Sequence, residues 1–280
     1  MKISQKIALG YTAGKLQLLS VVSTKKAAAE AFKLFCTPQK RVLKRSSPVI
    51  DKAEVITVKS NGLNIYGYRW NHPANKKVLI AHGFESSAVN FEGFVSPLIK
   101  KGYEVIAFDA PAHGLSEGKQ IMLPLYKNML NAVYKAFGPF DAYIAHSLGG
   151  LAVAHFLPLI PHDHDTKLVL VAPATEITSV MDRFFRLLGL NNKVRQAFDK
   201  LSGDITGISP AEASILPTLK NIQAAMLWLH DTEDDITPFR DVEKIKSSDF
   251  PDIKFIITSG LGHRKIYRDA QSVMAITAFL

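Results

Sequence analysis

Short apolar runs alternate with helical segments along residues 77–280, and this alternation restricts the fold more than any other feature. Segments such as 91–101 and 123–137 have the apolar spacing of helices. Strands that alternate with helices predict a mostly parallel sheet covered on both faces, which is an α/β fold. Such sheets place ligands at the carboxyl ends of their strands. The predicted strands of this part are residues 77–81, 104–108, 141–145, 167–172, 225–230 and 253–258.

A hairpin precedes this alternation. Residues 55–59 and 63–70 alternate between apolar and polar side chains, and Asn61-Gly62 separates the two runs. Asn-Gly between alternating runs is a strong signal for a two-residue hairpin turn. At the other end of the chain, residues 264–280 predict one closing helix.

One long segment interrupts the alternation, and we expect it to form a small helical cap inserted at about residues 176–222. A short crossover would suffice there, but the segment contains two predicted helices, 180–188 and 194–201. Its large apolar residues either line an acyl pocket or form the packing face of the cap, and packing is the commoner use. These residues are Phe184, Phe185, Leu187 and Leu188.

The positive charge belongs to the N-terminal segment. Residues 1–46 hold ten basic residues and one acidic residue, a surplus that equals the net charge of +9 of the whole chain. Residues 47–280 are therefore neutral overall, and nucleic-acid binding by this part has no compositional support. We expect residues 1–46 to be a basic helical segment and residues 47–280 to be the main domain.

This basic segment has two interpretations. Ala28, Ala31, Phe32 and Phe35 fall at helical spacing before Thr37-Pro38 ends the helix. The helix either associates weakly with an anionic membrane surface or packs its phenylalanines on the protein and leaves its lysines solvated. We favour packing, because the apolar face is narrow and rich in alanine.

The segment does not have the pattern of a signal peptide or of a membrane span. Lys15 interrupts its apolar stretch, and no run reaches the 18 or so apolar residues of a span. Cys36 is the only cysteine, so no internal disulfide forms. These features predict a cytoplasmic protein in a reducing compartment.

A serine follows the predicted strand 141–145. The sequence Ala145-His146-Ser147-Leu148-Gly149 has small residues around the serine, and an apolar helical segment follows. A strand, a tight turn and a helix place such a hydroxyl beside the N–H groups of a helix N-terminus, which stabilise negative charge. The alternative is an ordinary helix N-cap serine.

Three further motifs follow predicted strands. They are His82-Gly83-Phe84, the acidic loop from Asp231 to Pro238, and Gly262-His263. A serine hydroxyl needs a base to become a nucleophile, and a histidine base needs a carboxylate to orient it. Loops at the carboxyl ends of parallel strands meet at one edge of a sheet, so we expect these groups to lie together.

The order serine, aspartate, histidine resembles that of the α/β-hydrolase family, and the resemblance covers residues 55–280. It implies an α/β-hydrolase fold with Ser147 as the nucleophile, His263 as the base and Asp234 as the acid. It also implies an oxyanion hole formed by the backbone N–H groups of Phe84 and Leu148.

The sequence departs from the family pattern at two positions. Ala145 replaces the first glycine of the serine turn, and Asp231 stands where the family usually has glycine. Glu233 and Asp235 also lie near Asp234 in the sequence and are alternative acids. Glu176 is a less favoured substitute.

The resemblance implies a serine hydrolase that cleaves a carboxylic ester or a related acyl compound through an acyl-enzyme. We expect a small-molecule acyl substrate and no cofactor or metal. Thioesterase, lysophospholipase, monoacylglycerol-lipase-like and carbon–carbon hydrolase activities are the alternatives, and a non-catalytic binding module is disfavoured. The segment His162-Asp163-His164-Asp165 has metal-ligand types, but a solvated loop is the favoured interpretation. No phosphate-binding glycine loop is present.

Overall fold

The computed structural model describes residues 3–43, 46–248, 250 and 252–280. The chain divides into two compact units. The helical unit consists of Met1–Thr37 and Glu176–Ser214, and the sheet unit consists of Pro38–Thr175 and Ile215–Leu280. The sequence analysis places an N-terminal segment at residues 1–46 and an insertion at about residues 176–222. In the structure, residues 215–222 belong to the sheet unit.

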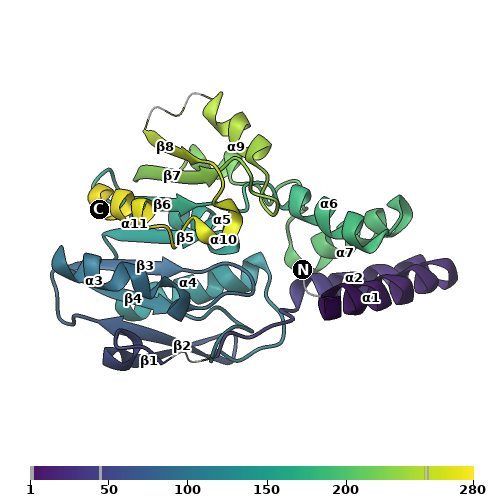
Figure 1. Ribbon diagram of the computed structural model, residues 1–280, viewed down its shortest axis with the longest axis horizontal. Coiled ribbons are helices and arrows are strands. Elements are labelled where there is room, and N and C mark those ends of the chain that lie inside the picture. Colours follow the sequence, from purple (N-terminus) through teal and green to yellow (C-terminus); the bar gives the residue numbers. More distant parts are fainter. Residues whose placement is uncertain (1–2, 44–45, 249, 251) are drawn as a thin grey trace. The chain divides into compact units, whose positions relative to one another are not determined.

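The sheet unit is built on one eight-stranded sheet in the order β1-β2-β4-β3-β5-β6-β7-β8 (Figure 1). β2 runs antiparallel to both β1 and β4, and the other neighbours are parallel. The mostly parallel sheet predicted from the sequence is therefore confirmed. The strands are β1 (Glu54–Ser60), β2 (Leu63–Trp70), β3 (Lys76–Ala81), β4 (Tyr103–Phe108), β5 (Ala142–His146), β6 (Lys167–Val171), β7 (Ala225–Asp231) and β8 (Ile253–Thr258).

The predicted hairpin is also confirmed. Ser60 pairs with Leu63, so Asn61 and Gly62 form a two-residue turn between β1 and β2. Their φ angles are 50° and 77°. Two successive positive φ angles match the twist of the flanking strands, and Asn-Gly is the pair that adopts them most readily.

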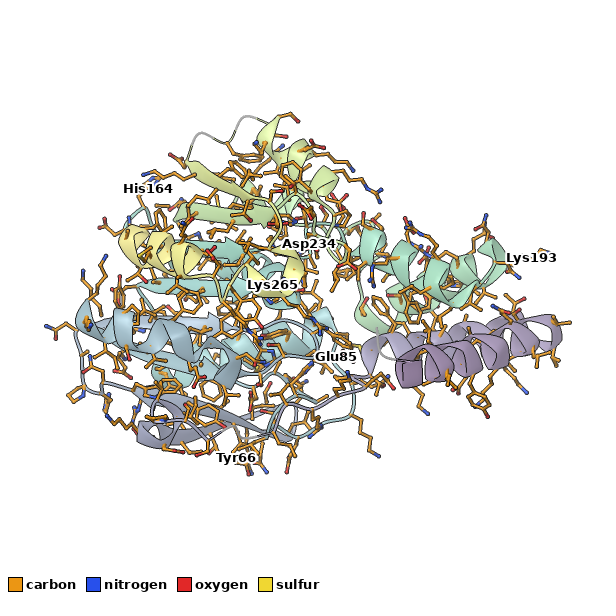
Figure 2. All side chains as sticks on the ribbon, viewed as in Figure 1. Tyr66, Glu85, His164, Lys193, Asp234 and Lys265 are labelled. Carbon is orange, nitrogen blue, oxygen red and sulfur yellow. The ribbon has the colours of Figure 1, made fainter. Side chains whose placement is uncertain are left out.

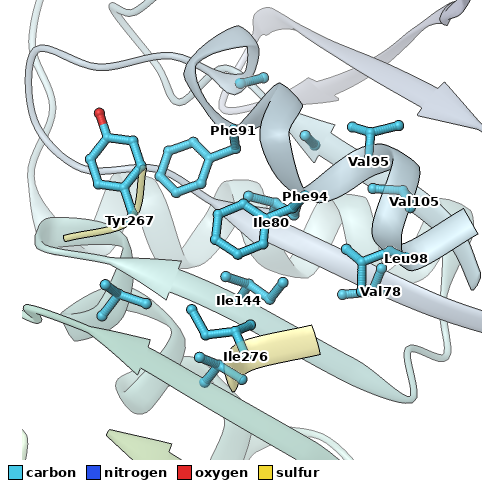
Figure 3. Packing of buried hydrophobic residues seen from close by; sticks show 14 of the residues in the cluster. Val78, Ile80, Phe91, Phe94, Val95, Leu98, Val105, Ile144, Tyr267 and Ile276 are labelled. Carbon is cyan, nitrogen blue, oxygen red and sulfur yellow. The ribbon is translucent and has the colours of Figure 1, made fainter. Parts of the chain in front are cut away.

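Helices cover both faces of the sheet. On one face, α3 (Glu92–Lys100) and α11 (Ala270–Phe279) pack against each other over a core that includes Ile80, Ile144 and Ile276 (Figure 3). Successive residues of a strand point to opposite faces of the sheet. The strand residues next in sequence to those of this core therefore form a second core on the opposite face.

That other face is covered by α4 (Leu123–Phe137) and α5 (Leu148–Phe156), which also pack on each other. The Phe108 ring of β4 lies 5.7 Å from the Phe137 ring of α4, measured between centroids. The other helical segments described in the sheet unit are η1 (Ile50–Lys52), η2 (Ala88–Phe91), η3 (Leu157–Leu159), α8 (Leu216–Leu219), α9 (Phe239–Lys246) and α10 (Gly262–Lys265).

The single closing helix predicted over residues 264–280 is wrong. The chain forms the short helix α10 and then, after a break, α11. The break is fixed by Asp269, whose carboxylate accepts a hydrogen bond from the Ser272 N–H and caps α11.

The helical unit contains α1 (Ile3–Val22), α2 (Thr24–Cys36), α6 (Ile177–Leu188) and α7 (Asn192–Thr206). α1 packs on α2 and α6, and α2 packs on α7 (Figure 1). The N-terminal segment therefore packs against the insertion. The sequence analysis predicted a helical segment over residues 1–46 and two helices in the insertion, and the structure has α1 and α2 in the first and α6 and α7 in the second.

Aromatic rings join these helices. The Phe198 ring of α7 lies 5.6 Å from Phe32 of α2 and 5.1 Å from Phe185 of α6, and Phe35 lies 5.2 Å from Phe184. Of the predicted apolar cluster, Phe184 and Phe185 pack within the helical unit and Leu188 is buried, whereas Leu187 is 48% exposed. None of the helices in the described ranges is both long and apolar enough to cross a bilayer.

Candidate active site

The predicted serine lies at a sharp turn between β5 and α5. Ser147 has φ 55° and ψ −121°, a conformation that is costly for a residue with a side chain. Small neighbours make the turn possible: a Cβ on Gly149 would collide with the Ala81 carbonyl, and one on Gly150 would lie 2.7 Å from Pro173 Cβ. Ala145, where the family has glycine, is fully buried, so the alanine is accommodated.

The structure brings together the predicted serine, histidine and aspartate, all within the sheet unit. Ser147 Oγ lies 2.9 Å from His263 Nε2, and His263 Nδ1 lies 2.7 Å from Asp234 Oδ2. Ser147 follows β5, Asp234 follows β7, and His263 lies in α10 after β8. Figure 2 labels Asp234 and, at the end of α10, Lys265. Each member is buried, with at most 7% of its surface exposed.

Asp234 is held as an anion. Its Oδ1 accepts hydrogen bonds from the N–H groups of Ile236 and Thr237, at 2.8 and 2.9 Å. Burial acts to raise the pKa of this carboxyl, but hydrogen bonds from His263 and from the backbone outweigh it, and the pKa lies below its usual value. An ionised Asp234 fixes the proton of His263 on Nδ1 and leaves Nε2 free to accept the proton of Ser147.

Thr237 is a residue of this network that the sequence analysis missed. Its hydroxyl donates to Asp234 Oδ2 at 2.8 Å and lies 3.1 Å from His263 Nδ1. The side chain is buried. In the sequence, the feature that could have indicated this role is the position of Thr237 in the acidic loop, three residues after Asp234. The folded loop is needed to show that its hydroxyl points to the Asp234 carboxylate.

The other acidic side chains of the loop have different partners. Asp231 Oδ2 accepts hydrogen bonds from Thr258 Oγ1 at 2.7 Å and from the Leu261 N–H at 3.0 Å. Its Oδ1 accepts from the Glu233 N–H. Burial opposes ionisation of Asp231, yet these hydrogen bonds keep its pKa below the usual value. Asp231 therefore ties the loop after β7 to the loop that carries His263.

The other acidic residues considered as alternatives to Asp234 lie in different surroundings. Glu233 Oε1 accepts a hydrogen bond from Ser259 Oγ, and Asp235 is exposed. Glu176 accepts a hydrogen bond from Ser214 within the helical unit. Among the described hydrogen bonds, that of Asp234 is the one that joins a carboxylate to His263 Nδ1.

The loop after β3 passes directly against the serine. A Cβ on Gly83 would lie 2.7 Å from Ser147 Cβ and 2.9 Å from His146 Nδ1, so only glycine fits there. The backbone of Gly83-Phe84 therefore borders the Ser147 side chain, and Leu148 begins α5 on its other side. This is the region where Phe84 and Leu148 were predicted to supply N–H groups.

Two neutral histidines shape this loop. His82 Nε2 accepts from the Ala110 N–H, and His113 Nε2 accepts from the Glu85 N–H. Burial lowers the pKa of His82 to about 4 and that of His113 to about 3. Both rings are therefore neutral near pH 7 and act as hydrogen-bond acceptors for the backbone.

His146 also has a structural position rather than a second base position. Its Nε2 lies 3.0 Å from the His263 carbonyl oxygen and donates to it, and its ring packs 4.6 Å from that of Tyr267. Burial lowers its pKa well below the usual value. Its Nδ1 has no hydrogen-bond partner among the described residues.

The metal-like segment His162 to Asp165 forms a turn. His162 uses both ring nitrogens on backbone groups, the Ile160 carbonyl and the Gln223 N–H, and Asp163 accepts from Thr166. Within the described ranges, no group of three or more histidine, cysteine or acidic side chains is placed to bind a metal ion.

Comparison with known proteins identifies the family of this chain. The family described as serine aminopeptidase, S33, matches residues 72–214, about half of the chain. The uncharacterized hydrolase YugF of Bacillus subtilis is 30% identical over 94 residues, which are 32% of this chain and 34% of that protein. The chain thus aligns with about a third of the length of this curated relative.

Solved structures share the fold. The Pyrococcus furiosus esterase Pf2001 has a TM-score of 0.66 at 19% identity, and the match covers 87% of this chain and 95% of that one. A thioesterase domain from the curacin biosynthetic pathway has a TM-score of 0.58 at 18% identity, covering 81% and 98%. With the sheet topology, these matches establish the α/β-hydrolase fold, and the chain belongs to the serine aminopeptidase S33 family of α/β-hydrolases.

Proposed function

We propose that this chain is a serine hydrolase that cleaves a carboxylic ester through an acyl-enzyme intermediate. The observation that carries the proposal is the continuous hydrogen-bonded series Ser147 Oγ, His263 Nε2, His263 Nδ1 and Asp234 Oδ2, with distances of 2.9 and 2.7 Å. This arrangement converts a weakly nucleophilic hydroxyl into an effective one by giving its proton a nearby acceptor.

The proposed reaction has two halves. Ser147 Oγ attacks the carbonyl carbon while its proton moves to His263 Nε2, and the resulting imidazolium is stabilised by Asp234. The imidazolium then protonates the departing alcohol, and the acyl group remains on Ser147. Water, deprotonated by the same histidine, attacks the acyl-enzyme. The bond between the acyl carbon and Ser147 Oγ breaks, the imidazolium returns its proton to Oγ, and the acid is released.

The backbone N–H groups of Phe84 and Leu148 would stabilise the negative charge of each tetrahedral intermediate. Support for this comes from the close contact of the Gly83 backbone with Ser147 and from the position of Leu148 at the start of α5. An oxyanion-hole donor of this kind contributes about 10²–10³-fold to the rate.

Thioester hydrolysis is the second candidate, because a thioesterase domain is among the structural neighbours. The family description adds a third acyl class, since it names an aminopeptidase. All three classes use the same nucleophile and differ in the group that leaves.

The test is a substrate panel of p-nitrophenyl esters of two to twelve carbons, the matching N-acetylcysteamine thioesters and amino-acid p-nitroanilides. We expect ester turnover to give the highest kcat/KM and to fall by at least about 10³-fold in Ser147→Ala. The matched control is Ser272→Ala, which removes another buried serine hydroxyl that has no described hydrogen-bond partner. Preferred turnover of thioesters or anilides would overturn the ester assignment, and full activity of Ser147→Ala would overturn the mechanism.

A further inference from the structure

An apolar stripe lies exposed along α1. It consists of Ile7, Tyr11, Leu18, Val21 and Val22, which are 68%, 76%, 73%, 86% and 83% exposed. These positions fall within about a third of the helix circumference at 100° per residue. Leu16, on the opposite side of α1, is buried at 4%. The inner side of α1 thus packs within the helical unit, and an apolar outer side is left open.

An exposed apolar stripe of this kind indicates a binding surface. Singly exposed apolar side chains are ordinary, but five on one side of a helix are typical of a surface that binds another molecule or a membrane.

The charges around the stripe favour an anionic partner. Lys15 lies at the edge of the stripe. Lys25 and Lys26 lie in the first turn of α2, three and four residues after Val22, the last residue of α1. All three are exposed. Lys25 and Lys26 also stand at the positive end of the α2 dipole, where anions are stabilising and cations are not. No acidic residue occupies that first turn to offset them.

We propose that this stripe of α1, together with Lys15, Lys25 and Lys26, binds the surface of an anionic phospholipid bilayer. The apolar side chains enter the boundary between headgroups and acyl chains, and the lysines contact lipid phosphates. The binding surface is α1 rather than the phenylalanine face of α2, because Phe32 and Phe35 already pack on α6 and α7.

The test is flotation of the full chain with vesicles of phosphatidylcholine alone or with 30% phosphatidylglycerol, at 50 and 500 mM NaCl. We expect binding only to the anionic vesicles and a loss of binding at high salt. Leu18→Ser/Val22→Ser and Lys25→Gln/Lys26→Gln should each reduce the partition coefficient about tenfold or more.

Matched controls change similar residues in the sheet unit. Leu159→Ser removes an apolar side chain that is 67% exposed, and Lys52→Gln/Lys119→Gln removes two exposed lysines. These controls should bind as the parent does. Absent binding to anionic vesicles, equal binding to neutral ones, or equal losses in the controls would overturn the proposal. A dimer in light scattering that Leu18→Ser/Val22→Ser dissociates, without vesicle binding, would assign the stripe to a second copy instead.

Discussion

Replacing Asp234 with asparagine should reverse the tautomer of His263. The N–H groups of Ile236 and Thr237 both donate to Oδ1, so the oxygen of the new amide stays at that position. Its NH₂ group then occupies the place of Oδ2, 2.7 Å from His263 Nδ1, and donates to it. With Nδ1 as acceptor, the proton of the neutral ring moves to Nε2, which then faces Ser147 with a hydrogen and cannot accept one.

The expected loss in kcat/KM is about 10³–10⁴-fold, or about 4–5.5 kcal/mol of transition-state stabilisation. The fold should survive, because the Thr237 hydroxyl can rotate to accept from the new NH₂ group. Steady-state turnover of a p-nitrophenyl ester measures the first effect, and thermal unfolding followed by circular dichroism measures the second.

Asp231→Asn is the matched control, with the opposite expectation. Each carboxylate oxygen of Asp231 accepts a hydrogen bond from a backbone N–H group. The NH₂ group of an asparagine would face one of these N–H groups, so two donors would meet without an acceptor. This costs about 1–3 kcal/mol of folding stability. Its kcat/KM should fall by about tenfold or less, because Asp231 contacts the histidine loop and not the imidazole. Near-normal activity of Asp234→Asn with a large loss in Asp231→Asn would refute this reasoning and make Asp231 the acid.

Three further predictions concern neighbouring residues. His263→Ala should lower kcat/KM by about 10³-fold or more and His146→Ala by about tenfold or less, since it is His263 Nε2 that lies 2.9 Å from the serine hydroxyl, whereas His146 Nε2 donates to a carbonyl. Equal losses in the same ester assay would contradict the assignment. Thr237→Val should lose about 1.5–3 kcal/mol in urea unfolding, because it removes a hydrogen bond to an ionised carboxylate, whereas Thr237→Ser should retain most of it. His82 and His113 have folded pKa values of about 4 and about 3, below that of an unfolded histidine, so the unfolded state binds more protons as pH falls below about 6.5. Unfolding free energy should therefore decrease from about pH 6.5 to pH 4, by about 1.4 kcal/mol per pH unit for each of the two histidines, and a flat profile would show that they are not buried as neutral rings.

The elements of the sheet could be predicted because their signals are local. Asn61-Gly62 defines its hairpin by backbone preference alone, and the apolar runs are bounded by turn residues. Ser147, Asp234 and His263 could be placed together because each follows a strand, and parallel strands end at one edge of the sheet.

Features that depend on three-dimensional contacts could not be predicted in this way. Residues 1–46 were predicted to be helical, but α1 has no clear polar side, so the sequence did not show which of its faces packs on α2 and α6. The break before α11 depends on the Asp269 cap, which is hidden in an otherwise helical pattern. Thr237 joins the candidate site only because the acidic loop folds back on Asp234.

The central claim is that Ser147 is the nucleophile, and covalent labelling tests it most directly. The protein is treated with a fluorophosphonate, digested, and the modified peptide is identified by mass spectrometry. We expect one adduct, on Ser147, which His263→Ala slows strongly and Ser147→Ala abolishes, while Ser272→Ala labels as the parent does. An adduct on another residue, or undiminished labelling of Ser147→Ala, would contradict the account.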